Sequence, residues 1–220
     1  MRSRAKSKAQ PIEKKRRKPA QARALDTVEV ILQASAQILE REGRTAFNTN
    51  HVAERAGISI GTLYQYFDNK QAILLEIARR EIERDRVSVS KAIVSASEGP
   101  PADPARIGLR ALIASQRQQS KVRRAAFDAL AAEGLSQFGS ESAAAFQHVT
   151  QLIGMRRERL FSAGARQPSP MGLFIISRAV TAVIRAAIVE ESPYLNSAEF
   201  EDELVHLVRA FFSQPPRSAA

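Results

Sequence analysis

The chain contains 220 residues, 44% of them hydrophobic, which is enough for one small domain that shares a core with a larger one. It has no cysteine, which excludes a disulfide framework and a thiolate metal site, and no run approaches the roughly 20 apolar residues of a membrane span. The N-terminus lacks the apolar stretch of a secretory signal, so we expect a soluble cytoplasmic protein that contacts no membrane.

The formal net charge of +10 is concentrated at the N-terminus. Residues 1–23 hold ten basic side chains and one acid, Glu13, for a net +9, whereas the remaining 197 residues hold 23 bases and 22 acids. Beyond Met1, Ile12 is the only large aliphatic side chain of this segment, which therefore has too little apolar surface to fold alone. The composition predicts a disordered basic arm over residues 1–23.

The first helix is predicted to begin at Asp26, because Asp26 and Glu29 have capping-box spacing, and to end at Gly43. Its apolar face consists of Val28, Ile31, Leu32, Ile38 and Leu39. Phe47 lies close enough to the next helix to anchor it. With the two helices that follow, the pattern predicts a three-helix unit of about 45 residues, which would be marginally stable alone.

Residues 49–70 have the pattern of a helix-turn-helix. Thr49 is a suitable N-cap for a helix of about two turns, Gly57 readily adopts the left-handed conformation that ends it, and Ser59 can cap the second helix. The apolar stripes expected to face each other are Val52, Ala53 and Ala56 in the first helix and Leu63 and Phe67 in the second. The caps, the turn and the stripes thus agree on one tight corner.

The remaining face of the second helix carries side chains suited to DNA. Gln65 can pair with adenine through two hydrogen bonds, the methyl group of Thr62 can meet that of thymine, and Gly61 lets the backbone approach closely. The hydroxyls of Tyr64 and Tyr66 suit phosphate oxygens. The alternative, a purely structural corner whose tyrosines only pack, is weaker because every local feature agrees with a DNA-reading face.

A third helix is predicted from Lys70, after the capping pair Asp68 and Asn69, to about Ala96. The charge of Lys70 and the N-terminal amides of this helix can meet the same phosphate. The helix adds Ile73, Leu74 and Ile77 to the core. Its charged run, residues 79–86, is interpreted as a solvated face, and the helix as the mechanical link between two domains.

The run from Val52 to Lys70 resembles the DNA-binding signature of the TetR family of bacterial transcription regulators, and the resemblance extends from about Asp26 to Ile77. It implies a homodimeric, all-helical protein of the bacterial cytoplasm and nucleoid, usually a repressor that a small molecule bound in the C-terminal domain releases from DNA. It implies contacts to phosphates or bases by Thr49, Thr62, Tyr64, Tyr66 and Lys70. It also implies operator-dependent contacts by Asn50, Ser59, Ile60, Gly61 and Gln65.

Two roles remain open for the basic arm. It can follow the minor groove or the phosphate backbone beside the helix-turn-helix, or it can be a solvated tail without specific contacts. Its position directly ahead of the DNA-binding unit favours the first role. Each phosphate that it neutralises would add about 0.9 to the salt slope of binding.

A break at residues 98–104 separates the second domain, whose first helix starts with Asp103 as N-cap and Pro104 in the first turn. Further helices are predicted over residues 120–134, 141–163, 172–190 and 197–213. No alternating strand pattern occurs, so the predicted fold is all-α, with about nine helices: an N-terminal three-helix helix-turn-helix domain and a C-terminal helical domain for ligand binding and dimerisation.

The last two helices have apolar faces that are broader than one side of a bundle needs, which predicts a homodimer joined through a four-helix bundle. The expected interface consists of Val180, Val183, Ile184, Ala187, Ile188, Leu204, Leu207, Val208 and Phe211. Two recognition helices would then meet successive major grooves, about 34 to 36 Å apart or slightly more, on a near-palindromic operator.

A pocket for a small, mainly apolar effector is expected between the helices of the second domain. The candidate lining residues, each of which also suits an ordinary core position, are Phe127, Phe138, Phe146, His148, Gln151, Met155 and Phe174. His51, His148 and His206 are too scattered for a metal site or a catalytic triad, and no glycine-rich loop follows a strand. We therefore predict no enzymatic activity, no cofactor and no metal.

The predicted domains are a basic arm (1–23), a DNA-binding domain (24–70), a connecting helix (71–98), an effector-binding and dimerisation domain (99–215) and a tail (216–220). The predicted function is a sequence-specific DNA-binding transcriptional regulator, most often a repressor released from its operator by an apolar effector. The alternative is an architectural DNA-binding protein with a basic tail and no effector, which specific binding in excess competitor DNA would exclude.

Overall fold

The computed structural model describes residues 17–98, 103–118, 120–133, 147–149, 151–153, 155 and 169–213, and every regular element within these ranges is a helix. The elements are α1 (Arg17–Arg41), α2 (Thr49–Ala56), α3 (Ile60–Tyr64), α4 (Lys70–Glu98), α5 (Pro104–Arg117), α6 (Ser120–Ala132), α9 (Pro170–Val189), the 3-10 helix η1 (Pro193–Asn196) and α10 (Ala198–Ser213). The predicted all-helical class is confirmed.

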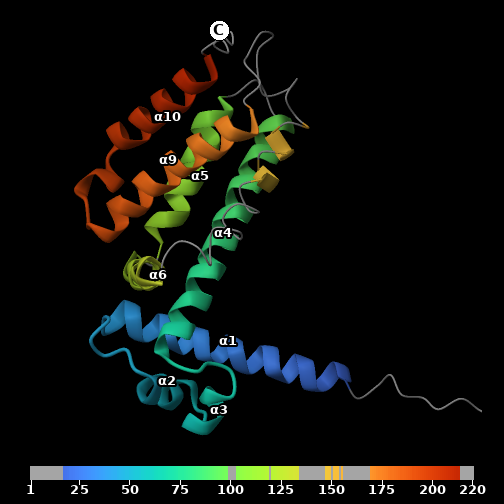
Figure 1. Ribbon diagram of the computed structural model, residues 1–220, viewed down its shortest axis with the longest axis vertical. Helices are drawn as coiled ribbons and strands as arrows, with labels where there is room; N and C mark the ends of the chain where they lie inside the picture. The colour runs from blue at the N-terminus through green and yellow to red at the C-terminus, as the bar shows by residue number, and fades with distance from the viewer. Residues whose placement is uncertain are drawn as a thin grey trace, which may run out of the picture.

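The helices form a lower and an upper group that α4 connects (Figure 1). The lower group consists of α1, α2, α3 and the first turns of α4, and the upper group of α5, α6, α9 and α10. The side chains that fill the lower core, all nearly inaccessible to solvent, are Ile31, Ile38, Leu39, Phe47, Val52, Leu63, Ile73 and Leu74. Burying these apolar side chains is the main stabilising contribution to the corner between α2 and α3.

The first helix begins at Arg17 rather than at Asp26, so residues 17–23 of the predicted disordered arm are helical. The segment before Asp26 is rich in Ala, Gln, Lys and Arg, which favour helices, and Pro19 lies in the first turn, where its missing N–H is not needed. Leu25 is 63% exposed, so helix propensity rather than burial accounts for this extension, which projects beyond the lower group in Figure 1. Residues 1–16 lie outside the described ranges.

The upper group confirms most of the predicted helices. Asp103 caps α5 by accepting from the backbone N–H groups of Ala105 and Arg106, with Pro104 in the first turn. The segment between the last two helices, predicted only as a break, forms η1 and buries Leu195. Most of the predicted helix over residues 141–163 lies outside the described ranges.

Helix α9 is the one described helix that is long and apolar enough to cross a membrane, judged by length and composition alone. The expectation that no run approaches this composition is therefore wrong. Its packing explains the composition: Ile176, Val180 and Ile184 are buried in the protein core, and two arginines, Arg178 and Arg185, interrupt the apolar sequence. We therefore interpret α9 as a core helix.

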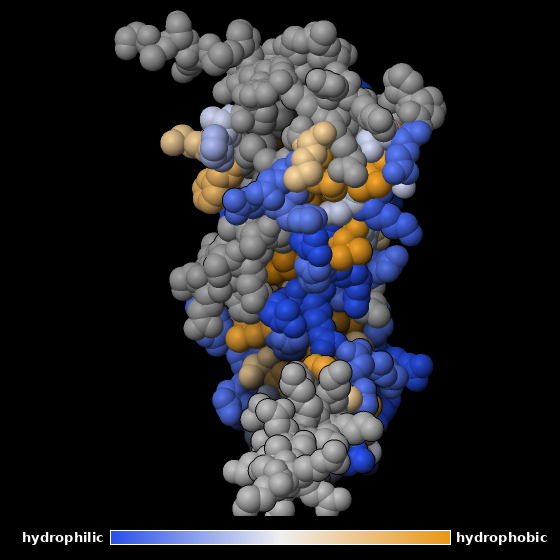
Figure 2. Space-filling view, turned by 90° about the vertical axis from the view of Figure 1, so that its right-hand side faces the viewer, coloured by the Kyte–Doolittle hydropathy of each residue, from blue (hydrophilic) through white to orange (hydrophobic). Residues whose placement is uncertain are grey.

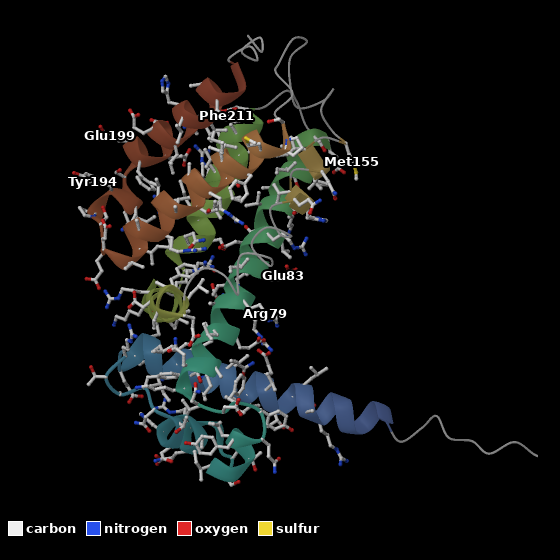
Figure 3. The ribbon with its side chains drawn as sticks, viewed as in Figure 1. Arg79, Glu83, Met155, Tyr194, Glu199 and Phe211 are labelled. Atoms are coloured by element: carbon white, nitrogen blue, oxygen red, sulfur yellow. The ribbon has the colours of Figure 1, made fainter. Side chains whose placement is uncertain are left out.

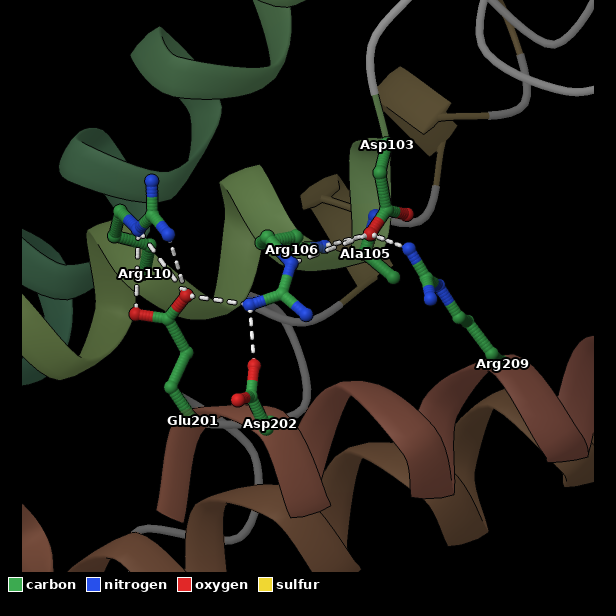
Figure 4. Close-up of polar contacts among 7 residues, drawn as sticks. All are labelled: Asp103, Ala105, Arg106, Arg110, Glu201, Asp202 and Arg209. Atoms are coloured by element: carbon green, nitrogen blue, oxygen red, sulfur yellow. Dashed lines mark hydrogen bonds and ion pairs between the residues drawn. The ribbon is translucent and has the colours of Figure 1, made fainter. Parts of the chain in front are cut away.

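Ion pairs hold α10 against α5 (Figure 4). Arg110 donates to Glu201 at 2.8 Å, and Arg106 donates to Asp202 at 2.6 Å and to Glu201 at 3.2 Å. Hydrogen bonds from Arg110 lower the pKa of Glu201, against a smaller opposing effect of burial. Because several charges share one network, this pairing stabilises the packing of the two helices more than an isolated surface pair would.

Candidate functional site

The first helix of the corner is capped by Asn48, not by Thr49 as predicted. The backbone of Asn48 is extended, with φ −146° and ψ 162°. Its side-chain oxygen accepts from the backbone N–H of His51 at 3.0 Å. Asparagine is at least as good a cap as threonine, so the helix begins one residue after it. The hydroxyl of Thr49 lies instead 3.1 Å from the hydroxyl of Tyr64, which links α2 to α3.

The turn and the second cap are as predicted. Gly57 has φ 67° and ψ 30°, the left-handed conformation, and its N–H bonds back to α2. The hydroxyl of Ser59 accepts from the backbone N–H of Thr62 at 3.0 Å and so caps α3. Leu63 and Phe67 are buried against the lower core, which confirms the expected stripe. Packing on one face of α3 therefore fixes the opposite face toward solvent.

The structure brings the predicted DNA-contacting residues together at the end of the molecule opposite α10 (Figure 1). The exposed members are Asn50, Ser59, Ile60, Gly61, Tyr64, Gln65 and Lys70, and the partly buried members are Thr49, Thr62 and Tyr66. Tyr66 also packs against the core, so the packing role weighed for it applies in part. Helix α3 ends at Tyr64, which places Gln65 in the following turn.

Lys70 stands at the start of α4, exposed to solvent. The side chain of Asn69 accepts from the backbone N–H of Ala72 at 2.9 Å, which confirms the predicted cap. His51, by contrast, is partly buried and already has neighbours: its Nδ1 lies 3.2 Å from the carbonyl oxygen of Ala46 and its Nε2 lies 3.6 Å from Glu42. The N-terminus of α4 is thus the better candidate for a phosphate.

The charged run of α4 is only partly solvated, which corrects the sequence-based interpretation. Arg79 and Glu83 project from α4 (Figure 3), and hydrophilic side chains cover much of the middle of the face in Figure 2. Glu81 and Asp85, however, are buried at 2% and 9% exposure against Arg123 of α6, which is 0% exposed. The distances from the Arg123 guanidinium are 2.5 Å to Glu81 Oε2 and 3.1 Å to Asp85 Oδ1.

Two side chains of α5 complete this buried charge cluster of Glu81, Asp85, Ser115, Gln116 and Arg123. Ser115 donates to Asp85 at 2.7 Å, Gln116 also donates to Asp85, and Arg123 donates to Gln116 at 3.0 Å. Burial raises the pKa of both Glu81 and Asp85, and the neighbouring Arg123 opposes this effect. The cluster joins α4, α5 and α6 through side-chain bonds.

A pocket lies beside this cluster, between α4, α5, α6 and α9, and its empty space amounts to about 750 Å³ when the open solvent at its mouth is included. Its apolar lining residues are Ile82, Val89, Leu112, Phe127, Val149 and Ile184. Its polar lining residues are Asp85, Arg86, Gln116, Arg178, Thr181 and Arg185. The pocket therefore combines apolar walls with charged groups, and it is less apolar than the sequence suggested.

Of the predicted lining residues, only Phe127 lines this pocket. His148, Gln151, Met155 and Phe174 are exposed, and Met155 projects away from the body of the molecule in Figure 3. Phe138 and Phe146 lie outside the described ranges. The prediction chose residues by apolar or aromatic type, whereas the side that each helix turns inward decides which of them face the cavity.

Most residues of the predicted dimer interface pack inside the protomer. Val180, Ile184, Ala187, Ile188 and Leu204 are buried, and Val208 and Phe211 are partly buried against the same core. Only Val183 and Leu207 remain exposed. The exposed apolar side of α9 carries Met171, Phe174, Ile175 and Val189 instead. Two apolar sides share this helix, and the sequence pattern did not separate them.

The fold and this corner define a helical protein with an N-terminal helix-turn-helix. Residues 31–77 match the family model described as bacterial regulatory proteins, tetR family. Known repressors align with the chain: it is 33% identical over 144 residues, 64% of its length, to the HTH-type transcriptional repressor KstR of Rhodococcus jostii. It is 37% identical over 65 residues to the repressor of the same name from Mycolicibacterium smegmatis. These matches identify residues 31–77 as a DNA-binding domain of the TetR family.

The alignments cover only part of these relatives, 60% of the Rhodococcus jostii protein and 32% of the Mycolicibacterium smegmatis protein. Solved structures match the fold over more of the chain. A putative TetR-family regulator from Mesorhizobium loti has a TM-score of 0.62 at 18% identity and covers 86% of this chain and 96% of its own. Thermus thermophilus FadR, a repressor solved with lauroyl-CoA, has a TM-score of 0.57 at 18% identity. This match covers 88% of the present chain and 100% of the FadR chain.

Proposed function

We propose that the protein is a sequence-specific DNA-binding transcriptional regulator, and specifically a repressor that a small effector releases from its operator. The observation that carries the proposal is the corner of α2 and α3. Its caps and buried stripe fix an exposed face that contains Thr62, Tyr64 and Gln65. The KstR relatives are repressors, and the family relation favours a regulatory over an enzymatic role.

The geometry suits insertion of α3 into a major groove. Gln65, directly after the helix, is placed to reach a base edge, and Gly61 allows the backbone of α3 to approach closely. The linked hydroxyls of Thr49 and Tyr64 suit one phosphate, and Lys70 with the first turn of α4 suits another. Phosphate contacts on both sides of α3 would set its register on the duplex.

A homodimer would place two such corners on one operator. The exposed apolar side of α9 offers Met171, Ile175 and Val189, with the small residues Ala182 and Ala186 between them for close approach of a second copy. Leu207 on α10 is 42% exposed and extends the apolar surface. Isologous pairing of this side would cover it and would call for a near-palindromic operator.

Effector release requires a connection from the pocket to the corner, and α6 provides one alongside α4. Arg44, between α1 and α2, donates to Asp128 of α6 at 2.6 Å, and Gln71 of α4 donates to the carbonyl oxygen of Ala129 at 2.9 Å. A ligand that shifts α6 would therefore tilt the corner and change the spacing of two corners in a dimer. Among fold neighbours, EbrR was solved with imidazole and FadR with lauroyl-CoA.

The test is a footprint on the intergenic DNA upstream of the protein's own gene, in excess competitor DNA and across a salt series. We expect a discrete, two-fold symmetric footprint. Smooth retardation that competitor DNA abolishes would contradict the proposal.

The basic N-terminus favours one second candidate, an architectural DNA-binding protein. Because α1 begins at Arg17, the informative truncation removes residues 1–16, which hold seven basic side chains. If the truncated protein keeps its footprint with a shallower salt slope, the segment acts as an arm of a specific regulator. If all binding disappears with the segment, the architectural function is supported instead.

A further inference from the structure

One cation in the upper pocket has no acidic partner within the described ranges. The guanidinium of Arg185, on α9, is stacked over the ring of Phe127 with its central carbon 4.8 Å from the ring centroid. It makes no hydrogen bond or ion pair to any residue that the structure describes. Burial lowers the pKa of Arg185, and the field of nearby Asp85 opposes this effect. Keeping a partly buried guanidinium charged without an ion pair costs free energy.

The two acids of the buried charge cluster already have other partners. Glu81 pairs with Arg123 and with Arg84. Asp85 accepts hydrogen bonds from Ser115, Gln116 and Arg123. The charged residues that line the pocket are Asp85, Arg86, Arg178 and Arg185, so its lining carries more positive than negative charge.

The walls above this charge are apolar. Ile82 and Val89 of α4, Leu112 of α5 and Ile184 of α9 line the pocket, which is open at one end. A ligand that matches both features has one anionic group and a hydrocarbon body. A neutral ligand would leave the guanidinium desolvated and unpaired, and a cationic ligand would be repelled by it.

We propose that the pocket binds an acidic amphiphile whose single carboxylate pairs with Arg185 and whose hydrocarbon body lies between α4 and α5. The planar guanidinium presents a fork of donors that fits a carboxylate in bidentate fashion. This inference rests on the proposed function because it names the class of the effector. It also replaces the mainly apolar effector that the sequence suggested with an anionic one.

The test compares three probes of equal chain length, namely decanoate, decanamide and decylamine, by isothermal titration calorimetry on the full-length protein. We expect decanoate to bind at least about tenfold more tightly than either of the others, as expected for one charge-assisted contact. Equal affinities for decanoate and decanamide, or a preference for decylamine, would overturn the proposal.

Arg185→Met keeps the apolar length of the side chain and removes the charge. It should weaken decanoate binding about tenfold or more and leave decanamide binding unchanged. A merely structural role would weaken both probes alike, and that result would overturn the assignment. Arg185→Lys should retain part of the decanoate preference. The matched control is Arg41→Met, at an exposed position at the end of α1, which should change neither affinity.

The same preparations should be footprinted, because the two proposals can fail separately. A specific footprint together with no decanoate preference would overturn the acidic amphiphile and leave the regulator standing. A clear decanoate preference that depends on Arg185, without any footprint, would support the pocket assignment and contradict the regulatory function.

Discussion

The two ends of the molecule bury different chemistry. In the lower group, the fully buried side chains of the corner, such as Phe47, Val52 and Leu63, are apolar, and the polar ones turn outward to a candidate DNA-reading face. In the upper group, Arg123 is 0% exposed and lies against two buried acids. The corner therefore buries apolar side chains, whereas the upper group also buries charged ones. The buried charge cluster joins three helices where apolar packing alone would be less directional.

Removing the cation of the cluster should have the largest effect on stability. Arg123→Met leaves Asp85 buried without its ion-pair partner and Glu81 with Arg84 alone, and breaking a buried pair in this way typically costs about 3 to 5 kcal/mol. The free energy of unfolding, measured with urea, should fall by this amount. The control is Arg44→Met, which breaks the partly exposed pair with Asp128 and should cost less than about 1 kcal/mol. Equal losses of unfolding free energy in the two variants would show that the buried charge cluster contributes no more to stability than a partly exposed ion pair.

At the other end, the largest effect should fall on DNA rather than on folding. Tyr64 is 48% exposed and bonds to Thr49, so Tyr64→Ala removes a candidate phosphate contact without opening the core. Operator affinity should fall about tenfold, as for loss of a hydrogen bond to a charged group, with an unchanged unfolding midpoint. The control, Tyr194→Ala, alters a more exposed tyrosine of the upper group, labelled in Figure 3, and should leave operator affinity intact. If both variants lowered operator affinity equally, the assignment of α3 to the DNA interface would be contradicted.

The sequence predicted the corner well because each signal there is local. Gly57 and Ser59 act on their own backbone neighbours, and the stripe of Leu63 and Phe67 follows helical periodicity. The error at the first cap, Thr49 in place of Asn48, arose because adjacent residues were both good caps. The early start of α1 was missed because a basic, apolar-poor segment satisfies the criteria for disorder and for helix propensity together.

The upper group was predicted less well because its decisive contacts join distant helices. Glu81 and Asp85 continue the buried stripe of Leu74 and Ala78 along α4, so the periodicity held a signal that their charge masked. Their partner, Arg123, comes from α6, and no local pattern links the two segments. The sequence did not separate core-facing from outward-facing residues in α9 for a related reason: a helix apolar on two sides does not reveal which side faces inward.

Backbone strain at the turn provides a smaller effect on stability at the lower end. Gly57 has φ 67°, and a Cβ there would meet nothing within 4 Å, so Gly57→Ala tests conformational strain alone. The variant should lose about 1 to 2 kcal/mol of stability. Gly61→Ala is the matched control in α3: no positive φ applies there and the nearest atom would lie 3.8 Å away, so its stability should hold or rise slightly. A similar loss in both variants would contradict the assigned turn.

The smallest effect, and the sharpest contrast between surface and buried charge, is expected in the pH dependence of stability. Hydrogen bonds from Arg110 lower the pKa of Glu201 below its ordinary value of 4.5, so the stability this carboxylate contributes is complete above that value and is lost as the pH falls through the folded pKa. Burial raises the pKa of Asp85 above 3.8, so its contribution to stability is larger at low pH and is lost as the pH rises.

The stability difference between wild type and Glu201→Gln should therefore narrow as the pH is lowered from 6 to 3, two values that each lie about 1.5 units from 4.5. In the same urea titrations, wild type should gain stability relative to Asp85→Asn as the pH falls, because only wild type has a carboxyl group at this position that takes up a proton in the folded state. If both differences move in the same direction, the pairing of Asp85 with Arg123 outweighs its burial, and the buried charge cluster behaves electrostatically like the surface network of α5 and α10.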